Sequence, residues 1–147
     1  MKVFSRRRLA SAAAGAAVLG VLPPAAAAQA APHDQIRTAY VPVTGSFVNT
    51  GTYLWPGLTL VTGTGTVFGI GGISGANGVR GCVAPSNAPD PGAPCDALVG
   101  RIGLHGTPFV VGNSDYIHVP WPGGELYLAA NTPFGGGSFH STILALS

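Results

Sequence analysis

The chain has 147 residues, with seven lysines and arginines against five aspartates and glutamates and a formal charge of +2. Four of the seven cations lie in the first eight residues, so the segment from Ala31 onward has three arginines, five acidic residues and a net charge of −2. A nucleic-acid-binding protein needs clustered cations to displace counterions from phosphates, and this segment has no such cluster. The composition therefore excludes nucleic acid as a partner and leaves room for one hydrophobic core.

The first 30 residues have the pattern of a secretory signal peptide. Basic residues in Met1–Arg8 precede an apolar run from Leu9 to Leu22, and small residues follow. Ala28-Gln29-Ala30 fits the small-x-small cleavage rule, so we expect a signal peptide at residues 1–30 and one mature domain at 31–147. The apolar run is shorter than the ~20 residues of a spanning helix, which argues against a membrane span.

Two export routes remain open. Ser5-Arg6-Arg7-Arg8-Leu9 resembles the twin-arginine signal of bacteria, but Ala10 replaces the second large apolar residue of that signal. A general-pathway signal is an equal alternative. Both routes predict a secreted, extracellular protein.

The mature segment predicts β-strands. Its apolar runs end at glycine, proline or asparagine, and none has the i, i+3, i+4, i+7 spacing of a helix. In chain order, strands are expected at Tyr40–Val43, Phe47–Val48 with Thr52–Leu54, Thr59–Thr64, Val67–Ile70, Ala97–Ile102, Pro108–Val111, Tyr116–Val119, Glu125–Ala129 and Ser138–Leu146. Leu126 and Leu128 should share one face of their strand, with Glu125 and Tyr127 on the other. Strands of this number and length predict an all-β fold, a jelly-roll-like antiparallel β-sandwich.

The segments between these strands read as turns and one long loop. Trp55-Pro56-Gly57 and Trp121-Pro122-Gly123-Gly124 have turn composition. The interval Gly71–Pro94 has no strand pattern, and a long loop in a compact domain is usually functional or disordered. We expect an ordered loop here, because a disulfide would restrain its far half.

Cys82 and Cys95 are the two cysteines of the chain. An even count in an oxidising compartment predicts a disulfide bond. A metal site is the alternative, but two thiols with no nearby histidine or second cysteine pair give little support for zinc.

Sequence motifs of catalysis are missing. Gly72-Ile73-Ser74-Gly75-Ala76 fails the G-x-S-x-G pattern at its last position. The histidines lack metal-ligand spacing and are expected to face solvent; they are His33, His105, His118 and His140. The few carboxylates are too scattered to indicate a glycosidase pair. We therefore expect a protein that is not an enzyme.

Three segments in consistent order resemble the LecA-like family of bacterial galactose-binding lectins. The first is Thr52–Val61 with its Pro-Gly turn, and the second is Cys95–Gly103 with the pattern Cys-x-Ala-Leu-Val-x-x-Ile-Gly. The third is Gly124–Asn131, followed by Pro133 and Gly137-Ser138-Phe139. The resemblance implies a small β-sandwich of galactose-binding-domain type that binds sugar through calcium.

The same resemblance locates a calcium site that has lost most of its ligands. In the family, an aspartate, two adjacent asparagines and the carbonyl of an early aromatic residue bind calcium. Asn131 falls at the aspartate, Phe68 could supply the carbonyl, and Gly135-Gly136 occupies a shortened loop without the asparagines. Calcium takes six to eight oxygens, usually with several carboxylates. We therefore expect no cofactor, with a surviving calcium site as the alternative.

Two functions from different classes remain. The first is a secreted, lectin-like carbohydrate-binding module, because aromatic faces can stack on sugar rings; its candidate residues are Tyr116, His118, Trp121, Asn131 and Asp90. The second is a secreted structural or interaction protein on a lectin-type scaffold that binds no sugar. A weakly charged surface promotes self-association, so a homo-oligomer is the partner expected in that case.

Overall fold

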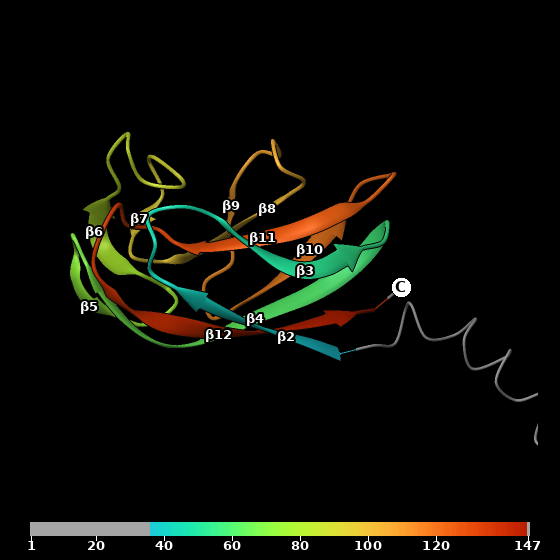
Figure 1. Ribbon diagram of the computed structural model, residues 1–147, viewed down its shortest axis with the longest axis horizontal. Helices are drawn as coiled ribbons and strands as arrows, with labels where there is room; N and C mark the ends of the chain where they lie inside the picture. Colours follow the sequence, from blue (N-terminus) through green and yellow to red (C-terminus); the bar gives the residue numbers. More distant parts are fainter. Residues whose placement is uncertain (1–35, 147) are drawn as a thin grey trace, which may run out of the picture. The chain divides into compact units, whose positions relative to one another are not determined.

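The computed structural model describes residues 36–146, and this part of the chain forms two antiparallel β-sheets (Figure 1). The predicted signal peptide, its predicted cleavage site and His33 lie outside the described residues. The strands are β2 (Ile36–Pro42), β3 (Val48–Leu54), β4 (Gly57–Gly69), β5 (Gly72–Ser74), β6 (Val79–Val83), β7 (Pro94–Cys95), β8 (Leu98–Ile102), β9 (Phe109–Val110), β10 (Ser114–Val119), β11 (Gly124–Ala130) and β12 (Gly136–Ala145). Within residues 36–146 there is no helix long and apolar enough to cross a membrane.

The sheets have five and four strands. The larger has the order β10-β4-β12-β2, with β5 paired to β4, and the smaller has the order β3-β11-β8-β9. Strands β6 and β7 form a separate two-stranded ribbon. The all-β antiparallel sandwich predicted from the sequence is confirmed.

The core lies between the inner faces of the two sheets. Leu126 and Leu128 are fully buried, as their alternation with Glu125 and Tyr127 predicted. Phe139 of β12 and Val61 of β4 meet them from the larger sheet as members of one hydrophobic cluster. Burying such side chains removes apolar surface from water and is the main stabilising term of the sandwich.

Two strands expected in β4 are one continuous strand. The sequence pattern predicts separate strands at Thr59–Thr64 and Val67–Ile70 with a break at Gly65, but β4 runs unbroken from Gly57 to Gly69. The glycine at 63 allows close packing, because an added Cβ would lie 2.4 Å from the Leu98 side chain. At position 63, glycine is therefore needed because the opposite sheet comes close, and not because the chain turns.

The expectation of a strand-free interval at Gly71–Pro94 was wrong. The interval contains β5 and β6 and the first residue of β7. These strands are short and glycine-rich, so their side chains show no alternation. They are held instead by pairing with β4 and by the Cys82–Cys95 disulfide, which is confirmed with a Cα–Cα distance of 5.3 Å.

Candidate functional site

Asn131 follows directly after the last residue of β11, and its side chain is fully buried. Its Oδ1 accepts a hydrogen bond from the Asp90 backbone N–H at 2.8 Å. Its Nδ2 donates to the carbonyl oxygens of Asp90 at 2.9 Å and Pro94 at 3.0 Å. The amide therefore fastens the segment between β6 and β7 to the sandwich.

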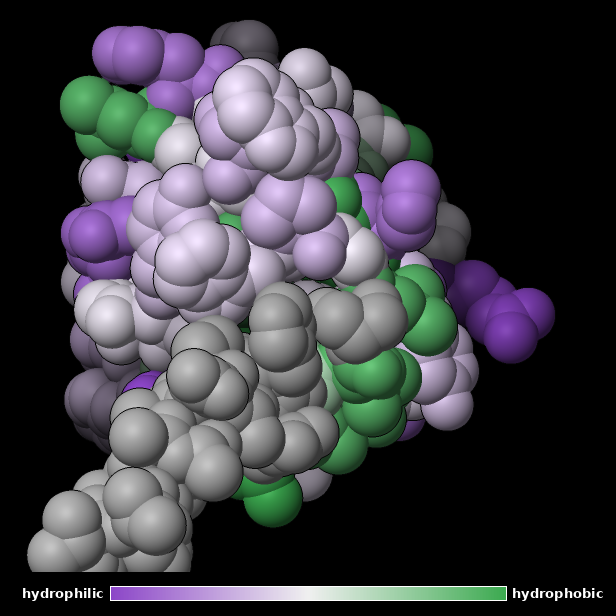
Figure 2. Space-filling model, turned by 90° about the vertical axis from the view of Figure 1, so that its right-hand side faces the viewer, coloured by the Kyte–Doolittle hydropathy of each residue, from purple (hydrophilic) through white to green (hydrophobic). Residues whose placement is uncertain are grey.

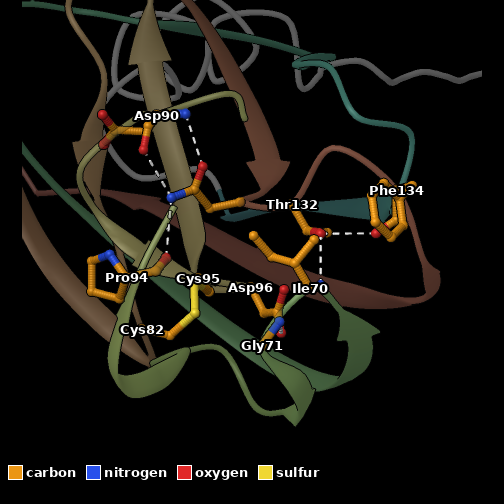
Figure 3. The surroundings of a disulfide bond; sticks show 10 residues. Ile70, Gly71, Cys82, Asp90, Pro94, Cys95, Asp96, Thr132 and Phe134 are labelled. Atoms are coloured by element: carbon orange, nitrogen blue, oxygen red, sulfur yellow. Dashed lines mark hydrogen bonds between the residues drawn. A yellow bond between two sulfur atoms is a disulfide. The ribbon is translucent and has the colours of Figure 1, made fainter. Parts of the chain in front are cut away.

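Asp96 follows Cys95 and is fully buried with φ at +67°, a conformation that aspartate and asparagine tolerate better than most residues (Figure 3). Its Oδ2 accepts from the Gly71 N–H at 3.1 Å, and its Oδ1 has no hydrogen-bond partner. The nearby Thr132 hydroxyl donates its one proton to the Phe134 carbonyl at 2.8 Å. Burial raises the pKa of the Asp96 carboxyl, and the hydrogen bond from the Gly71 N–H partly opposes that rise.

These residues fit calcium poorly. The Asn131 oxygen already accepts from a backbone N–H, and the Phe68 carbonyl oxygen is covered by Gly135, where an added Cβ would lie 2.0 Å away. Asp90 contacts Asn131 through its backbone, and burial raises the pKa of its carboxyl. Residues 36–146 contain no group of three or more His, Cys, Asp or Glu side chains that could hold a metal ion.

Two of the predicted sugar-binding residues meet in a groove at the other end of β11. His118 of β10 and Trp121 of the following turn line a cavity of about 380 Å³. Its other walls come from the end of β8, β9 and the turns around them: Ile102, Gly106, Thr107, Phe109, Ile117, Pro120, Pro122 and Gly123. Tyr116 lies two residues before His118 on the outer face of β10 and is 63% exposed, but it does not line the groove.

Trp121 is the most exposed large apolar side chain of the described residues, at 85%. Figure 2 views the molecule from the side on which the β3–β4 and β10–β11 turns lie. Most of this surface has intermediate hydropathy, and hydrophobic residues gather on one part of it. Single exposed apolar side chains are common on protein surfaces, so the indole is informative because it lies beside a groove and not because it is exposed.

A second cluster lies on the outer face of the smaller sheet and was missed by the sequence analysis. The Arg101 guanidinium carbon is 4.3 Å from the centroid of the Phe47 ring and 5.3 Å from that of Tyr127. Nearby, the Asn49 side-chain amide donates to the Glu125 carboxylate. These residues come from three strands and a loop, so no local motif joins them.

The three histidines that the structure describes, at 105, 118 and 140, are exposed, as expected. His140 packs against Tyr40 with ring centroids 5.4 Å apart.

Comparison with known proteins supports the fold. No protein-family model and no curated protein matches the sequence. Among solved structures, the chain is similar to the EclA N-terminal domain, a PllA-like lectin, with a TM-score of 0.53 and 19% sequence identity over 73% of this chain and 93% of that one. The similarity shows that this chain adopts a fold that a lectin domain also uses.

Proposed function

We propose that this protein is a secreted, non-catalytic, lectin-like module that binds a glycan in the groove beside Trp121 without calcium. The observation that carries the proposal is the exposed indole of Trp121 at the mouth of a groove that also contains His118 and Thr107. The fold shared with a lectin domain supports the scaffold.

The groove has the composition that a sugar ring requires. One face of a pyranose is lined by C–H groups and stacks on an aromatic ring, while its hydroxyls need donors and acceptors. Trp121 offers the ring, and the Thr107 hydroxyl can both donate and accept a hydrogen bond. Ile102, Phe109 and Ile117 make the floor apolar, which is typical of small-ligand sites.

Calcium independence follows from the contacts of Asn131, the residue that the family resemblance places in a calcium site. Asn131 uses both its oxygen and its nitrogen in hydrogen bonds to the chain. The side chain is fully buried, so an ion could reach its oxygen only if the segment around Asp90 moved away and these hydrogen bonds were lost. The groove lies at the opposite end of β11 and requires no residue of that site.

A glycan array of soluble oligosaccharides tests the proposal, with the mature chain probed with and without a calcium chelator. We expect sugar-specific binding that the chelator leaves unchanged and that Trp121→Ala abolishes. Trp55→Ala is the matched control, because Trp55 is also exposed but packs on Tyr53 outside the groove, and it should bind as the parent does. A blank array, or binding that survives Trp121→Ala, contradicts the proposal.

A second function, self-association without sugar binding, is favoured by the outer face of the larger sheet. Its outward side chains on the central strands carry no formal charge, and include Thr62, Thr64 and Thr66 of β4 beside Ser138, His140 and Thr142 of β12. A neutral face lacks the like-charge repulsion that keeps copies apart. Sedimentation that shows concentration-dependent dimers together with a blank glycan array would favour this function.

A further inference from the structure

Arg101 and Glu125 are neighbours of opposite charge that do not pair. Arg101 of β8 lies directly across from Tyr127 of β11, and Glu125 is two residues before Tyr127 on the same outer face. Such diagonal positions place Cβ atoms about 7–8 Å apart, within reach of two long side chains. No ion pair joins these two residues in the described part of the chain, because each is held by other groups.

The arginine is held by aromatic rings. Its guanidinium carbon lies close to the rings of both Phe47 and Tyr127, and its Nε is buried without a hydrogen-bond partner. Cation–π contact uses the face of the guanidinium and leaves its planar edge of N–H donors unused. The stacking also limits side-chain rotation, so little entropy is lost when a ligand accepts those hydrogen bonds.

The glutamate is held by a bulge of β3. Asn49 pairs with Tyr127 and Tyr53 pairs with Glu125, so β3 advances by four residues where β11 advances by two. In this bulge the Asn49 Oδ1 accepts from the Gly51 N–H at 2.8 Å, and the Asn49 Nδ2 donates to Glu125. Gly51 has a φ of +76° and open space where a side chain would stand, so the bulge leaves the surface beside the carboxylate uncovered. Bulges often re-aim side chains at functional sites.

We propose that Arg101, Tyr127, Glu125 and Asn49 form a second saccharide site, selective for neutral sugars. The proposal takes its ligand class from the proposed function but uses a different face of the molecule. Adjacent sugar hydroxyls accept from the fixed guanidinium and donate to the fixed carboxylate, while Tyr127 lies beneath the ring. A uronic acid is attracted by Arg101 but repelled by Glu125, and an amino sugar the reverse, so the attraction of either charged sugar is offset, whereas neutral hydroxyls bond favourably to both groups.

Titration of the ¹⁵N-labelled mature chain by NMR tests this site directly. The probes are the methyl pyranosides of glucose, galactose, mannose and N-acetylglucosamine, with glucuronic acid and glucosamine as charged counterparts. We expect at least one neutral glycoside to shift the Arg101 Nε–H signal and the amides of Glu125 and Tyr127. Glucuronic acid and glucosamine should bind this site at least about tenfold more weakly.

Two conservative variants test the contributions of the two charged side chains one at a time. Arg101→Lys keeps the charge but loses the planar donors, and should weaken the neutral sugar about tenfold, as measured at Glu125 and Tyr127. Glu125→Gln keeps an oxygen for Asn49 and should reduce the preference for neutral sugar over glucuronic acid about tenfold. Arg80→Lys, a change at an exposed arginine of β6, should alter neither affinity beyond about twofold. Unchanged dispersion of the amide spectrum shows that each variant is folded.

Failure of this site is distinguishable from failure of the groove. Trp121→Ala should erase shifts at Gly106, Thr107 and His118 and preserve those at Glu125 and Tyr127. The second site is overturned if no neutral glycoside shifts the Arg101 Nε–H up to about 50 mM, where millimolar affinities saturate. It is also overturned if glucuronic acid binds equally well or if the shifts at Tyr127 survive Arg101→Lys unchanged.

Discussion

Polar side chains are buried at one end of β11, and an aromatic side chain is exposed at the other. At its last residue, Ala130, the strand leads into Asn131 and Thr132, whose side chains are buried and hydrogen-bonded to the chain. Before its first residue, Gly124, the turn exposes Trp121 beside a groove. The polar side chains at the first end stabilise the fold through hydrogen bonds, whereas the indole at the second end is accessible from solvent. The two ends of β11 therefore differ in which of their side chains are open to solvent.

Replacing Asn131 by alanine should have the largest effect on stability. The change removes three buried hydrogen bonds, and although the Asp90 carbonyl keeps the Ala93 N–H as a donor, the Asp90 N–H and the Pro94 carbonyl lose the Asn131 amide, at a cost of about 3–5 kcal/mol in the free energy of unfolding. Urea denaturation measures it. Trp121→Ala is the control from the other end of β11 and should stay within about 0.5 kcal/mol, because the indole is exposed. Equal losses of stability in Asn131→Ala and Trp121→Ala would contradict the difference between the two ends of β11.

The disulfide should contribute a similar amount at the same end. Replacing Cys82 and Cys95 together by serine frees a 13-residue span, and chain entropy predicts a loss of up to about 3 kcal/mol. The hydrogen bonds of Asn131 to the enclosed segment reduce this loss if they order it without the bond. Denaturation of the double variant gives the value, and thiol counting on the unfolded, unreduced parent should find no free cysteine. Two reactive thiols would contradict the bridge.

Asp96 should make stability depend on pH in the acidic range. Burial raises the pKa of its carboxyl above the ordinary 3.8, so between these values the native state keeps a proton that the unfolded chain has lost. The free energy of unfolding therefore falls as pH rises through that window and then levels off. Asp96→Asn should remove this component and stabilise the protein near neutral pH, because asparagine accepts from Gly71, tolerates the positive φ and carries no buried charge.

Denaturation of both proteins across the acidic and neutral range measures the difference. The pKa of Asp90 is also raised by burial, so Asp90→Asn is the matched control for the second carboxyl near this end. A parent whose stability rises with pH in that window, relative to Asp96→Asn, would show that the Asp96 carboxylate is stabilised by a partner that the hydrogen bonds do not show.

Calcium should have the smallest effect. A ligand at 100 times its dissociation constant adds about 2.7 kcal/mol to stability, which moves the midpoint of a domain of this size by several degrees. We expect millimolar calcium to leave the thermal midpoint unchanged, because the Asn131 oxygen is already used. Differential scanning calorimetry with calcium and with chelator decides it. A rise of about five degrees that Asn131→Ala abolishes would show that the ion competes successfully with the chain for this residue.

The candidate sites illustrate what spacing along the chain can predict. Tyr116, His118 and Trp121 are close in sequence, and an exposed strand followed by a turn keeps His118 and Trp121 close in space. Arg101, Asn49 and Glu125 are far apart in sequence, and sheet register and a bulge bring them together. Asn131 was identified by its position in a resemblance, but only its contacts show that its amide has a structural role.

The sequence by itself determined the class of the fold and the pairing of its cysteines. Alternation in Glu125–Ala129 and apolar runs bounded by glycine and proline are local signals, since a strand buries every second side chain whatever its partners are. Tertiary structure decided that β4 continues through Gly65, that β5 and β6 exist, and which polar groups are free. Those outcomes depend on contacts between distant segments, and a hydrogen bond such as that of Asn131 to Asp90 leaves no trace in the order of the residues.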